Sequence, residues 1–397
     1  MNTTANITSL GQRGEGLAEI GGKRVYVPFT LPGEAVDVAV EGERGRLLAV
    51  ITPSPHRITP FCPHFGICGG CQLQHIDAET YAAFKRGLVE TALSHANVTT
   101  MLAPLIDARG NGRRRATLHA RKDGAGFMAF HTHALHPIDL CPILVPALAK
   151  APAIARAIYG SVGDCEVAFT ATLTGLDVAV RPEKKARLER LTPLAQHYAL
   201  ARLSLDGEPV IQAQAPVLRL GKALVEIPPQ SFLQATEAAE TALGDLVVAA
   251  LKGHKEIADL FCGVGPFALR LAEGARVYAA DSDKLAIAAL IKGFHNARGL
   301  KLISAERRDL FRESLITLEL NRFDGVVFDP PRAGAEAQAI ELARSKVKTV
   351  VAVSCDPKTF ARDAAILIGG GYRLESVTPV DQFAFSTHVE LVGVFRR

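Results

Sequence analysis

A cysteine near the end of the chain has the surroundings of a catalytic nucleophile. Cys355 follows the apolar run Val351-Ala-Val-Ser and precedes Asp356-Pro, so the pattern places it between a strand and a helix that begins at the proline. We expect the positive end of that helix to lower the pKa of the thiol and to favour the thiolate. A thiolate can add to carbon 6 of a pyrimidine, which enables carbon 5 to attack a sulfonium methyl group. A purely structural cysteine is the alternative.

Such an addition also requires a base, because the proton on carbon 5 must leave before the thiolate can be released. Glu390, in Thr387-His-Val-Glu at the start of the last predicted strand, is our candidate, and His388 is the second choice. A carboxylate beside the start of a strand is often simply exposed to solvent, which is the alternative here.

A glycine turn within the stretch 256–281 is the predicted binding site of the methyl donor. A predicted strand ends at Asp259, Gly263 and Gly265 follow, an apolar helix leads away, and a second strand stops at Asp281. Glycine permits a tight turn and the close approach of a ligand, while an acid at the second strand end can bind ribose hydroxyls. The complete dinucleotide spacing is missing, so a nucleoside without phosphates, such as S-adenosylmethionine, fits better. An ordinary tight turn is the alternative.

Strands and helices alternate through the last part of the chain, which predicts a doubly wound sheet of the α/β class. Ligands bind such sheets beyond the carboxyl ends of the strands. Several candidates fall at predicted strand ends and are expected to share one crevice: Asp259, Asp281, Asp309, Asp329 and Cys355.

The motif Asp329-Pro-Pro-Arg indicates which atom accepts the methyl group. In methyltransferases that act on amino nitrogens the corresponding motif ends in an aromatic residue, whereas Arg332 ends it here. Carbon is therefore the favoured acceptor. A cytosine-5-methyltransferase is a weaker alternative, because Ser354 and not proline precedes Cys355.

Three cysteines lie within ten residues in Cys62-Pro-His-Phe-Gly-Ile-Cys68-Gly-Gly-Cys71, and the glycines allow their sulfur atoms to converge. Cys141 is the best candidate for a fourth ligand, since proline follows it as it follows Cys62, and Cys165 is a weaker one. Clustered thiols in a reducing compartment predict a metal site, with buried or redox thiols as the alternative. The spacing alone suits zinc and an iron–sulfur cluster equally well.

The 397 residues are enough for roughly two or three domains. We expect a small β-barrel at 1–58, the cysteine loop at 59–76, a central α+β domain at 77–225 and the doubly wound domain at 226–397. The net charge of +4 permits a nucleic-acid partner without requiring one. No apolar run suggests a membrane span, and a cytoplasmic protein is expected.

Two stretches favour RNA as the partner. The pattern Gly14-Glu-Gly, Val25-Tyr-Val-Pro and Leu31-Pro-Gly-Glu resembles a TRAM domain, an RNA-binding barrel found on RNA-modifying enzymes. The run Arg113-Arg-Arg alternates onward like a strand and could meet phosphates without reading sequence. A solvated strand edge protected by charge is the alternative for this run.

Together these motifs resemble the family of RNA uracil-5-methyltransferases, specifically the branch with a TRAM domain and a four-iron four-sulfur cluster that modifies 23S ribosomal RNA. The resemblance covers nearly the whole chain, and its motifs are the barrel, the cysteine set, Ser231-Phe-Leu-Gln, Asp259-Leu-Phe-Cys-Gly-Val-Gly, Asp329-Pro-Pro-Arg, Ser354-Cys-Asp-Pro and His388-Val-Glu.

The resemblance implies a role for each of these residues. Cys355 would be the nucleophile and Glu390 the base, and an iron–sulfur cluster rather than zinc would be held by Cys62, Cys68, Cys71 and Cys141. S-adenosylmethionine would be contacted by Gln234, Phe261, Asp281 and Asp329, with Asp309 near the adenine. The expected enzyme is a monomer acting on ribosomal RNA. Transfer RNA as the substrate, or a non-catalytic iron–sulfur RNA-binding factor, are the alternatives.

Overall fold

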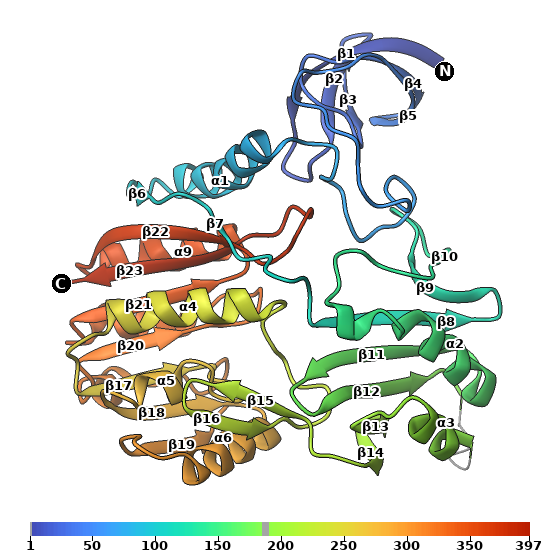
Figure 1. The fold of residues 1–397 in the computed structure, drawn as a ribbon. Coiled ribbons are helices and arrows are strands. Elements are labelled where there is room, and N and C mark those ends of the chain that lie inside the picture. The colour runs from blue at the N-terminus through green and yellow to red at the C-terminus, as the bar shows by residue number, and fades with distance from the viewer. Residues whose placement is uncertain (1, 185–189) are drawn as a thin grey trace.

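Five strands at the N-terminus close into a barrel, shown at the top of Figure 1 in a computed structural model that describes residues 2–184 and 190–397. The strands β1 (Asn2–Leu10), β2 (Gly16–Ile20), β3 (Lys23–Val27), β4 (Ala35–Glu41) and β5 (Arg44–Thr52) follow the order β1-β2-β3-β5-β4. Alternate apolar residues point inward and form the barrel core: Ala5, Ile7, Ala18, Val25, Val27, Val36 and Val38. The predicted small barrel is confirmed.

The chain then runs through the cysteine segment, residues 53–76, to a long helix. Helix α1 (Ala78–His95) begins at Asp77, whose side chain accepts a hydrogen bond from the amide of Thr80. Val89 and Leu93 of α1 belong to the same hydrophobic cluster as the C-terminal sheet. The short strands β6 (Met101–Leu102) and β7 (Ile106–Asp107) pair with the edge of that sheet. The first part of the range assigned to a central domain thus packs on the C-terminal domain.

A mixed seven-stranded sheet forms the middle of the molecule, with the order β10-β9-β8-β11-β12-β13-β14. Its strands are β8 (Arg115–Arg121), β9 (Gly124–Met128), β10 (Leu135–Pro137), β11 (Cys165–Thr172), β12 (Gly175–Pro182), β13 (Arg202–Leu205) and β14 (Glu208–Gln212). The turn η1 (Pro146–Leu148) and the helices α2 (Ala151–Val162) and α3 (Leu191–His197) pack against it. The charged stretch from about Glu183 to His197 predicts a single helix, but the chain bends at 183–184 and α3 begins at Leu191; residues 185–189 lie outside the described residues.

The C-terminal domain is built on the predicted doubly wound sheet, which is confirmed with the order β19-β18-β17-β20-β21-β23-β22. The strands are β17 (Glu256–Leu260), β18 (Arg276–Asp281), β19 (Ile303–Arg307), β20 (Gly325–Phe328), β21 (Thr349–Ser354), β22 (Arg373–Asp381) and β23 (Glu390–Arg396). Neighbouring strands are parallel except β23, which runs antiparallel to both of its neighbours.

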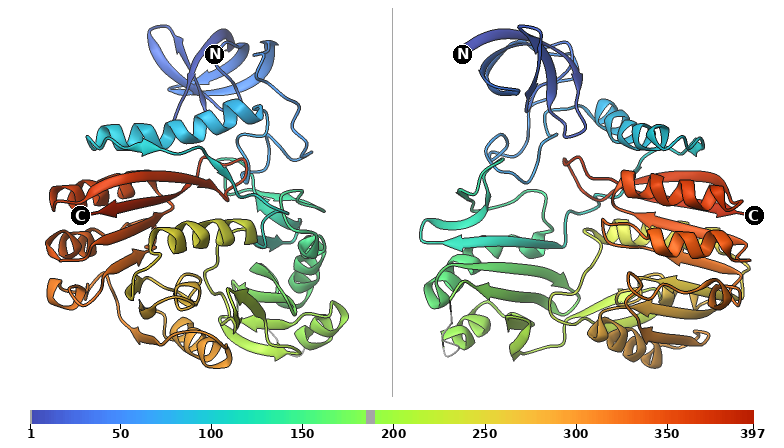
Figure 2. Two further views of the ribbon diagram at one scale, coloured as in Figure 1. Left: turned by 60° about the vertical axis from the view of Figure 1, so that its left-hand side comes forward. Right: turned by 180° about the vertical axis from the view of Figure 1, so that it is seen from behind.

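Helices cover both faces of this sheet, as the two views of Figure 2 show. One face packs on α4 (Glu237–Ala250), α5 (Ala268–Leu271), α6 (Lys284–Asn296) and the hairpin β15 (Val217–Leu220)–β16 (Ala223–Glu226). The other packs on α1, α7 (Thr317–Leu320), α8 (Glu336–Arg344) and α9 (Pro357–Gly369). Burial on both faces explains why these strands are continuously apolar. Among the helices of the described residues, none has the length and apolar character that a membrane span requires.

Candidate active site

A cavity of about 550 Å³ lies beyond the carboxyl ends of the parallel strands. Strands β17, β18, β20 and β21 direct their last residues or the loops that follow them toward it, as expected for a doubly wound sheet. The structure brings together here all seven side chains that were predicted to act on the donor or the substrate: Gln234, Phe261, Asp281, Asp309, Asp329, Cys355 and Glu390.

The glycine loop between β17 and α5 forms one wall of this cavity. Gly263 and Gly265 have φ angles of +52° and +90°, which side chains rarely adopt. A Cβ atom at Gly265 would lie 2.3 Å from Cδ1 of Leu290 in α6. The loop therefore requires glycine at both positions, and its backbone is left open to the cavity. The helix that follows is a single turn, shorter than the sequence pattern suggests.

Asp281 is fixed against this loop. One of its carboxylate oxygens accepts a hydrogen bond from the amide of Gly263 at 2.9 Å, and the other accepts one from the amide of Asp283 at 2.8 Å. Each oxygen keeps a lone pair that can accept from a ribose hydroxyl. This arrangement fits the nucleoside part of S-adenosylmethionine.

Two aromatic rings line the same part of the cavity. Phe261 has a φ angle of +62°, unusual for a residue with a side chain, and its ring lies 5.4 Å from the ring of Phe311. Asp309 accepts a hydrogen bond from the amide of Phe311 at 3.1 Å. Phe311 was not predicted from the sequence, although an aromatic residue two positions after the candidate Asp309 was a signal that could have identified it.

A chain of hydrogen bonds connects Asp329 with Glu390. Gln234 donates to Asp329 at 3.1 Å, and Gln382 donates to Gln234 at 2.6 Å and to Glu390 at 2.6 Å. Gln382 also accepts from the amide of Ala235 at 2.6 Å, which fixes the orientation of its side chain. Four side chains from three separate segments therefore form one connected network along the floor of the cavity.

Burial raises the pKa of both carboxyl groups in this network. Glu390 is only 2% exposed, and burial, with the charge of Asp329 as a further cause, raises its pKa to about 8. Burial also raises the pKa of Asp329 to about 7. A carboxyl group with a pKa in this range can accept and return a proton near neutral pH. The alternative of a solvent-exposed Glu390 is therefore wrong.

Gln382 is the central member of the network, and it was not predicted from the sequence. It follows the last residue of β22 and lies in no recognisable motif. The hairpin that pairs Val380 with Glu390 brings it beside the carboxyl group eight positions later. A polar side chain directly after an apolar strand was the single signal available.

Cys355 lies in the cavity, but its thiol is not activated as predicted. Burial, followed by the nearby charges of Glu390 and Asp329, raises its pKa to about 11. The prediction of a pKa lowered by α9 is wrong, because Asp356 caps that helix and accepts from the amides of Lys358 and Thr359 at 2.9 and 3.1 Å. These amides bond to a carboxylate and no longer favour a second negative charge.

Two further candidates lie outside this cavity. His388 lines a neighbouring cleft and lies 3.2 Å from the guanidinium of Arg332, while Glu390 faces the catalytic cavity itself. Asp259, expected in the crevice, is completely buried beneath the glycine loop, and burial raises its pKa well above the ordinary range. It lies one residue before the end of β17, close enough to Asp329 and Asp281 for their charges to raise its pKa further.

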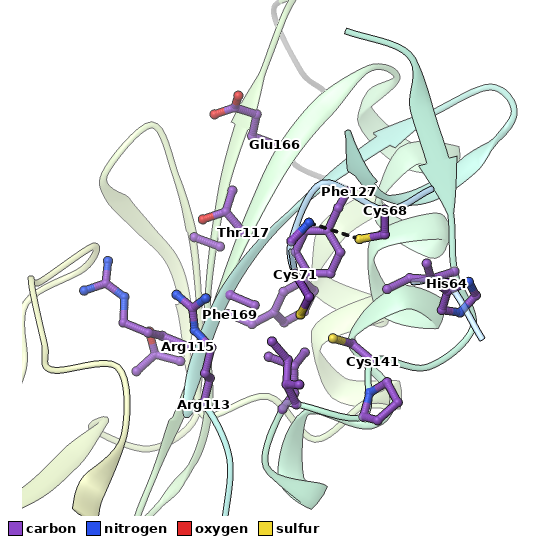
Figure 3. A pocket seen from close by; sticks show the side chains of 18 of the residues that line it. His64, Cys68, Cys71, Arg113, Arg115, Thr117, Phe127, Cys141, Glu166 and Phe169 are labelled. Carbon is purple, nitrogen blue, oxygen red and sulfur yellow. Dashed lines mark hydrogen bonds between the residues drawn. The ribbon is translucent and has the colours of Figure 1, made fainter. Parts of the chain in front are cut away.

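A second cavity, of about 490 Å³, is lined by the four predicted thiols Cys62, Cys68, Cys71 and Cys141, and Figure 3 labels the last three. Cys165 does not line it, because its side chain is buried in the core of the central domain. Burial raises the pKa of Cys71 to about 12 and that of Cys141 to about 11. Within residues 2–184 and 190–397, no three His, Cys, Asp or Glu side chains have the arrangement of a metal-ion site.

Arg113 and Arg115 line both cavities, and so does Ser231. Arg113 is close enough to Cys71 and Cys141 for their charges to interact. Two arginines of the predicted basic run therefore lie between the thiols and the catalytic cavity, whereas Arg114 is buried and forms an ion pair with Glu240 at 2.6 Å.

The comparisons with known proteins agree with this geometry. Residues 221–397 match the family model of the tRNA (uracil-5-)-methyltransferases. The chain is similar to an uncharacterised RNA methyltransferase of Brucella melitensis, at 46% identity over 98% of this chain and 97% of that one. It is also similar to the 23S rRNA (uracil(1939)-C(5))-methyltransferase of Chromohalobacter salexigens, at 34% identity over 99% of this chain and 89% of that one.

The same fold occurs in a solved structure. The tRNA (uracil-54, C5)-methyltransferase of Pyrococcus abyssi, crystallised with S-adenosyl-L-homocysteine, superimposes with a TM-score of 0.77 over 98% of this chain and 99% of that one. The identity is 24%, so this likeness concerns the fold.

Proposed function

The chain belongs to the family of S-adenosylmethionine-dependent RNA uracil-5-methyltransferases, and from this premise we propose that it methylates carbon 5 of a uridine in 23S ribosomal RNA. The observation that carries the proposal is the position of Cys355 and Glu390 in one cavity with the glycine loop and Asp281. The relative from Chromohalobacter salexigens, which is named for 23S rRNA and is similar along its length, supports ribosomal RNA over transfer RNA.

Cys355 is the proposed nucleophile. Its sulfur forms a bond to carbon 6 of the uracil, and the electron pair of the carbon 5–carbon 6 double bond moves toward the oxygen on carbon 4. S-adenosylmethionine, when bound, supplies the electrophilic methyl group that carbon 5 takes. The raised pKa of Cys355 means that its proton must move as the bond forms, and the carboxyl group of Asp329 lies in the same cavity to receive it, which leaves Glu390 free for the later step.

Glu390 is the proposed base for the second half of the reaction. It removes the proton from carbon 5, the double bond re-forms, and the bond between carbon 6 and Cys355 breaks to release the thiolate. Gln382 holds the carboxyl group in place through the bond at 2.6 Å. The pKa of about 8 makes the ionised carboxylate a stronger base than an ordinary glutamate, and the ionised fraction that can act increases as the pH rises toward 8.

Four residues fit a four-iron four-sulfur cluster as ligands: Cys62, Cys68, Cys71 and Cys141. The support is their chemistry and their position, since four thiols line a single cavity and all-thiol ligation is typical of such clusters. The same donors also suit zinc, and the resemblance of the cysteine set to that of the iron–sulfur branch of the family favours the cluster.

The experiment that tests the mechanism separates bond formation from release. Glu390→Gln should permit addition and methylation but stop elimination, so that protein and RNA accumulate as a species that survives denaturation. Cys355→Ala should form no such species. Labelled fragments of 23S rRNA and labelled transfer RNA, each incubated with S-adenosylmethionine and separated on a denaturing gel, identify the substrate as well.

Glu208→Gln, an exposed carboxyl group in the central domain, is the matched control and should turn over normally. Normal turnover by Glu390→Gln with no retarded band would remove Glu390 from the role of base and leave His388 as the candidate. A retarded band with transfer RNA and none with the ribosomal fragments would overturn the substrate proposal.

A further inference from the structure

A buried lysine from the first half of the chain binds both ends of the loop that precedes Glu390. Lys85, on α1, is completely buried. Its ammonium group donates to the carboxylate of Asp381 at 2.5 Å, to the carbonyl of Phe383 at 3.1 Å and to the carbonyl of His388 at 2.7 Å. An ammonium group has three donors, and each of the three has an acceptor here.

These three acceptors enclose the loop 382–389. Asp381 is the last residue of β22, Phe383 lies at the start of the loop, and His388 lies two residues before Glu390 opens β23. One side chain therefore fixes where the loop leaves the first strand and where it enters the second. The loop carries Gln382, which bonds to Glu390.

The tip of the same loop is held by a second residue of α1 and by one further segment. The hydroxyl of Tyr81 donates to Asp381 at 2.7 Å and accepts from the amide of Phe385 at 3.0 Å. The amides of Gln72 and Leu73, directly after Cys71, donate to the carbonyl of Phe385 at 2.8 and 3.0 Å. Phe385 has a φ angle of +57°, a conformation that such contacts must hold in place.

We propose that Lys85 is a positioning residue for proton removal, because its three bonds hold the loop 382–389 so that Gln382 orients the carboxyl group of Glu390. The inference rests on the proposed function of Glu390 as the base. Lys85 does not line the catalytic cavity, so any effect that it has on Glu390 must be transmitted by the loop 382–389. Addition by Cys355 depends on β21 and α9, which Lys85 does not bind. Its loss should therefore slow release more than bond formation.

The test follows the covalent species formed by the full-length protein with S-adenosylmethionine and an RNA that the unaltered protein methylates. In Lys85→Met, the species should form at close to the normal rate and decay about 10- to 100-fold more slowly, within the range that a misplaced general base accounts for. Lys252→Met, at an exposed lysine, should leave both rates unchanged. Equal slowing of formation and decay in Lys85→Met would overturn the inference.

A double variant separates positioning from stability. Lys85→Met leaves the carboxylate of Asp381 buried without its cation, which is destabilising, whereas Lys85→Met with Asp381→Asn removes that charge as well. The double variant should regain thermal stability but keep the slow decay, since the carbonyls of Phe383 and His388 still lack their donor. Recovery of normal decay together with stability would show a merely structural role.

Tyr81→Phe is a milder change that removes a hydroxyl and leaves the ring. It should slow decay less than Lys85→Met does. Slowing as large as that of Lys85→Met, or larger, would contradict the conclusion that Lys85 makes the main contacts to the loop. Glu390→Gln serves as the reference in every assay. If it traps no species, the proposed function fails; if it does while the Lys85 variants release normally, the inference about Lys85 alone fails.

Discussion

The two cavities that share Arg113 and Arg115 differ in how their buried ionisable groups are partnered. In the catalytic cavity, the carboxyl groups of Asp329 and Glu390 are connected through the amides of Gln234 and Gln382, so the chain itself satisfies them. In the cysteine cavity, burial raises the pKa of the thiols, and Arg113 is a cation of the chain that lies near them. The first site is organised by hydrogen bonds, and the second has donors suited to a metal centre.

The largest effect that distinguishes the two cavities should come from serine substitutions of cysteines. Anaerobically purified protein should contain about four irons per chain, because four thiolates fully ligate a cubane cluster. Cys71→Ser should lose most of this iron, while Cys165→Ser, a buried cysteine outside the cavity, should retain it. Iron and zinc analysis of each preparation checks this. Stoichiometric zinc without iron in the unaltered protein would overturn the assignment of the cluster.

A smaller effect tests whether S-adenosylmethionine binding in the catalytic cavity is independent of the cysteine cavity. Asp281→Ala should weaken S-adenosylmethionine binding by roughly 1.5 to 3 kcal/mol, the loss expected when hydrogen bonds to a charged group disappear. Cys71→Ser should leave this affinity nearly unchanged, since the glycine loop and Asp281 do not contact the cysteine segment. Calorimetric titration of both variants measures the difference. Unchanged affinity in Asp281→Ala would place the ribose elsewhere.

The smallest effect concerns the free energy of unfolding and its dependence on pH. The pKa of Glu390 is raised from an ordinary value of 4.5 to about 8, so the folded chain keeps a proton that the unfolded chain has lost within this window. Its contribution to stability is therefore present below pH 4.5 and is lost as the pH rises toward 8. Glu390→Gln cannot lose that proton and should be more stable than the unaltered protein at pH 8, by on the order of 1 kcal/mol.

Urea unfolding at pH 5 and pH 8 measures this difference. Glu208→Gln, at an exposed position, should show no such change between the two pH values. A Glu390→Gln variant that is less stable at pH 8 would mean that the carboxylate is favourably paired in the folded state.

Local sequence patterns predicted the parts of the site that lie on single elements. Cys355 and Asp281 follow apolar strands, and the strand itself places them at the edge where ligands bind. Asp259 shows the limit of that reasoning, because it lies one position before the end of its strand and is completely buried there. The pKa of Cys355 was mispredicted for a similar reason, since Asp356 serves as the cap of the helix that was expected to act on the thiol.

Residues that act across the fold had no comparable signal. Gln382 meets Glu390 only because a hairpin pairs their strands, and Lys85 meets both ends of the same loop from a helix almost 300 positions earlier. The apolar face of α1 is visible in the sequence, but nothing in its spacing says that the partner is the C-terminal sheet. Contacts of this kind follow from topology and not from local pattern.

The pairing of β6 and β7 with β22 has a consequence for how the chain is made. Residues 101–107 are synthesised long before β22, yet they cover the outer edge of its sheet. Until β22 and β23 emerge, the early segments have no strand to join, and a piece limited to 221–397 would present β22 as an open edge beside an apolar surface that α1 normally covers. Open edges of this kind invite pairing with other chains. We therefore expect the N-terminal half to reduce aggregation of the catalytic half by covering this edge and this surface.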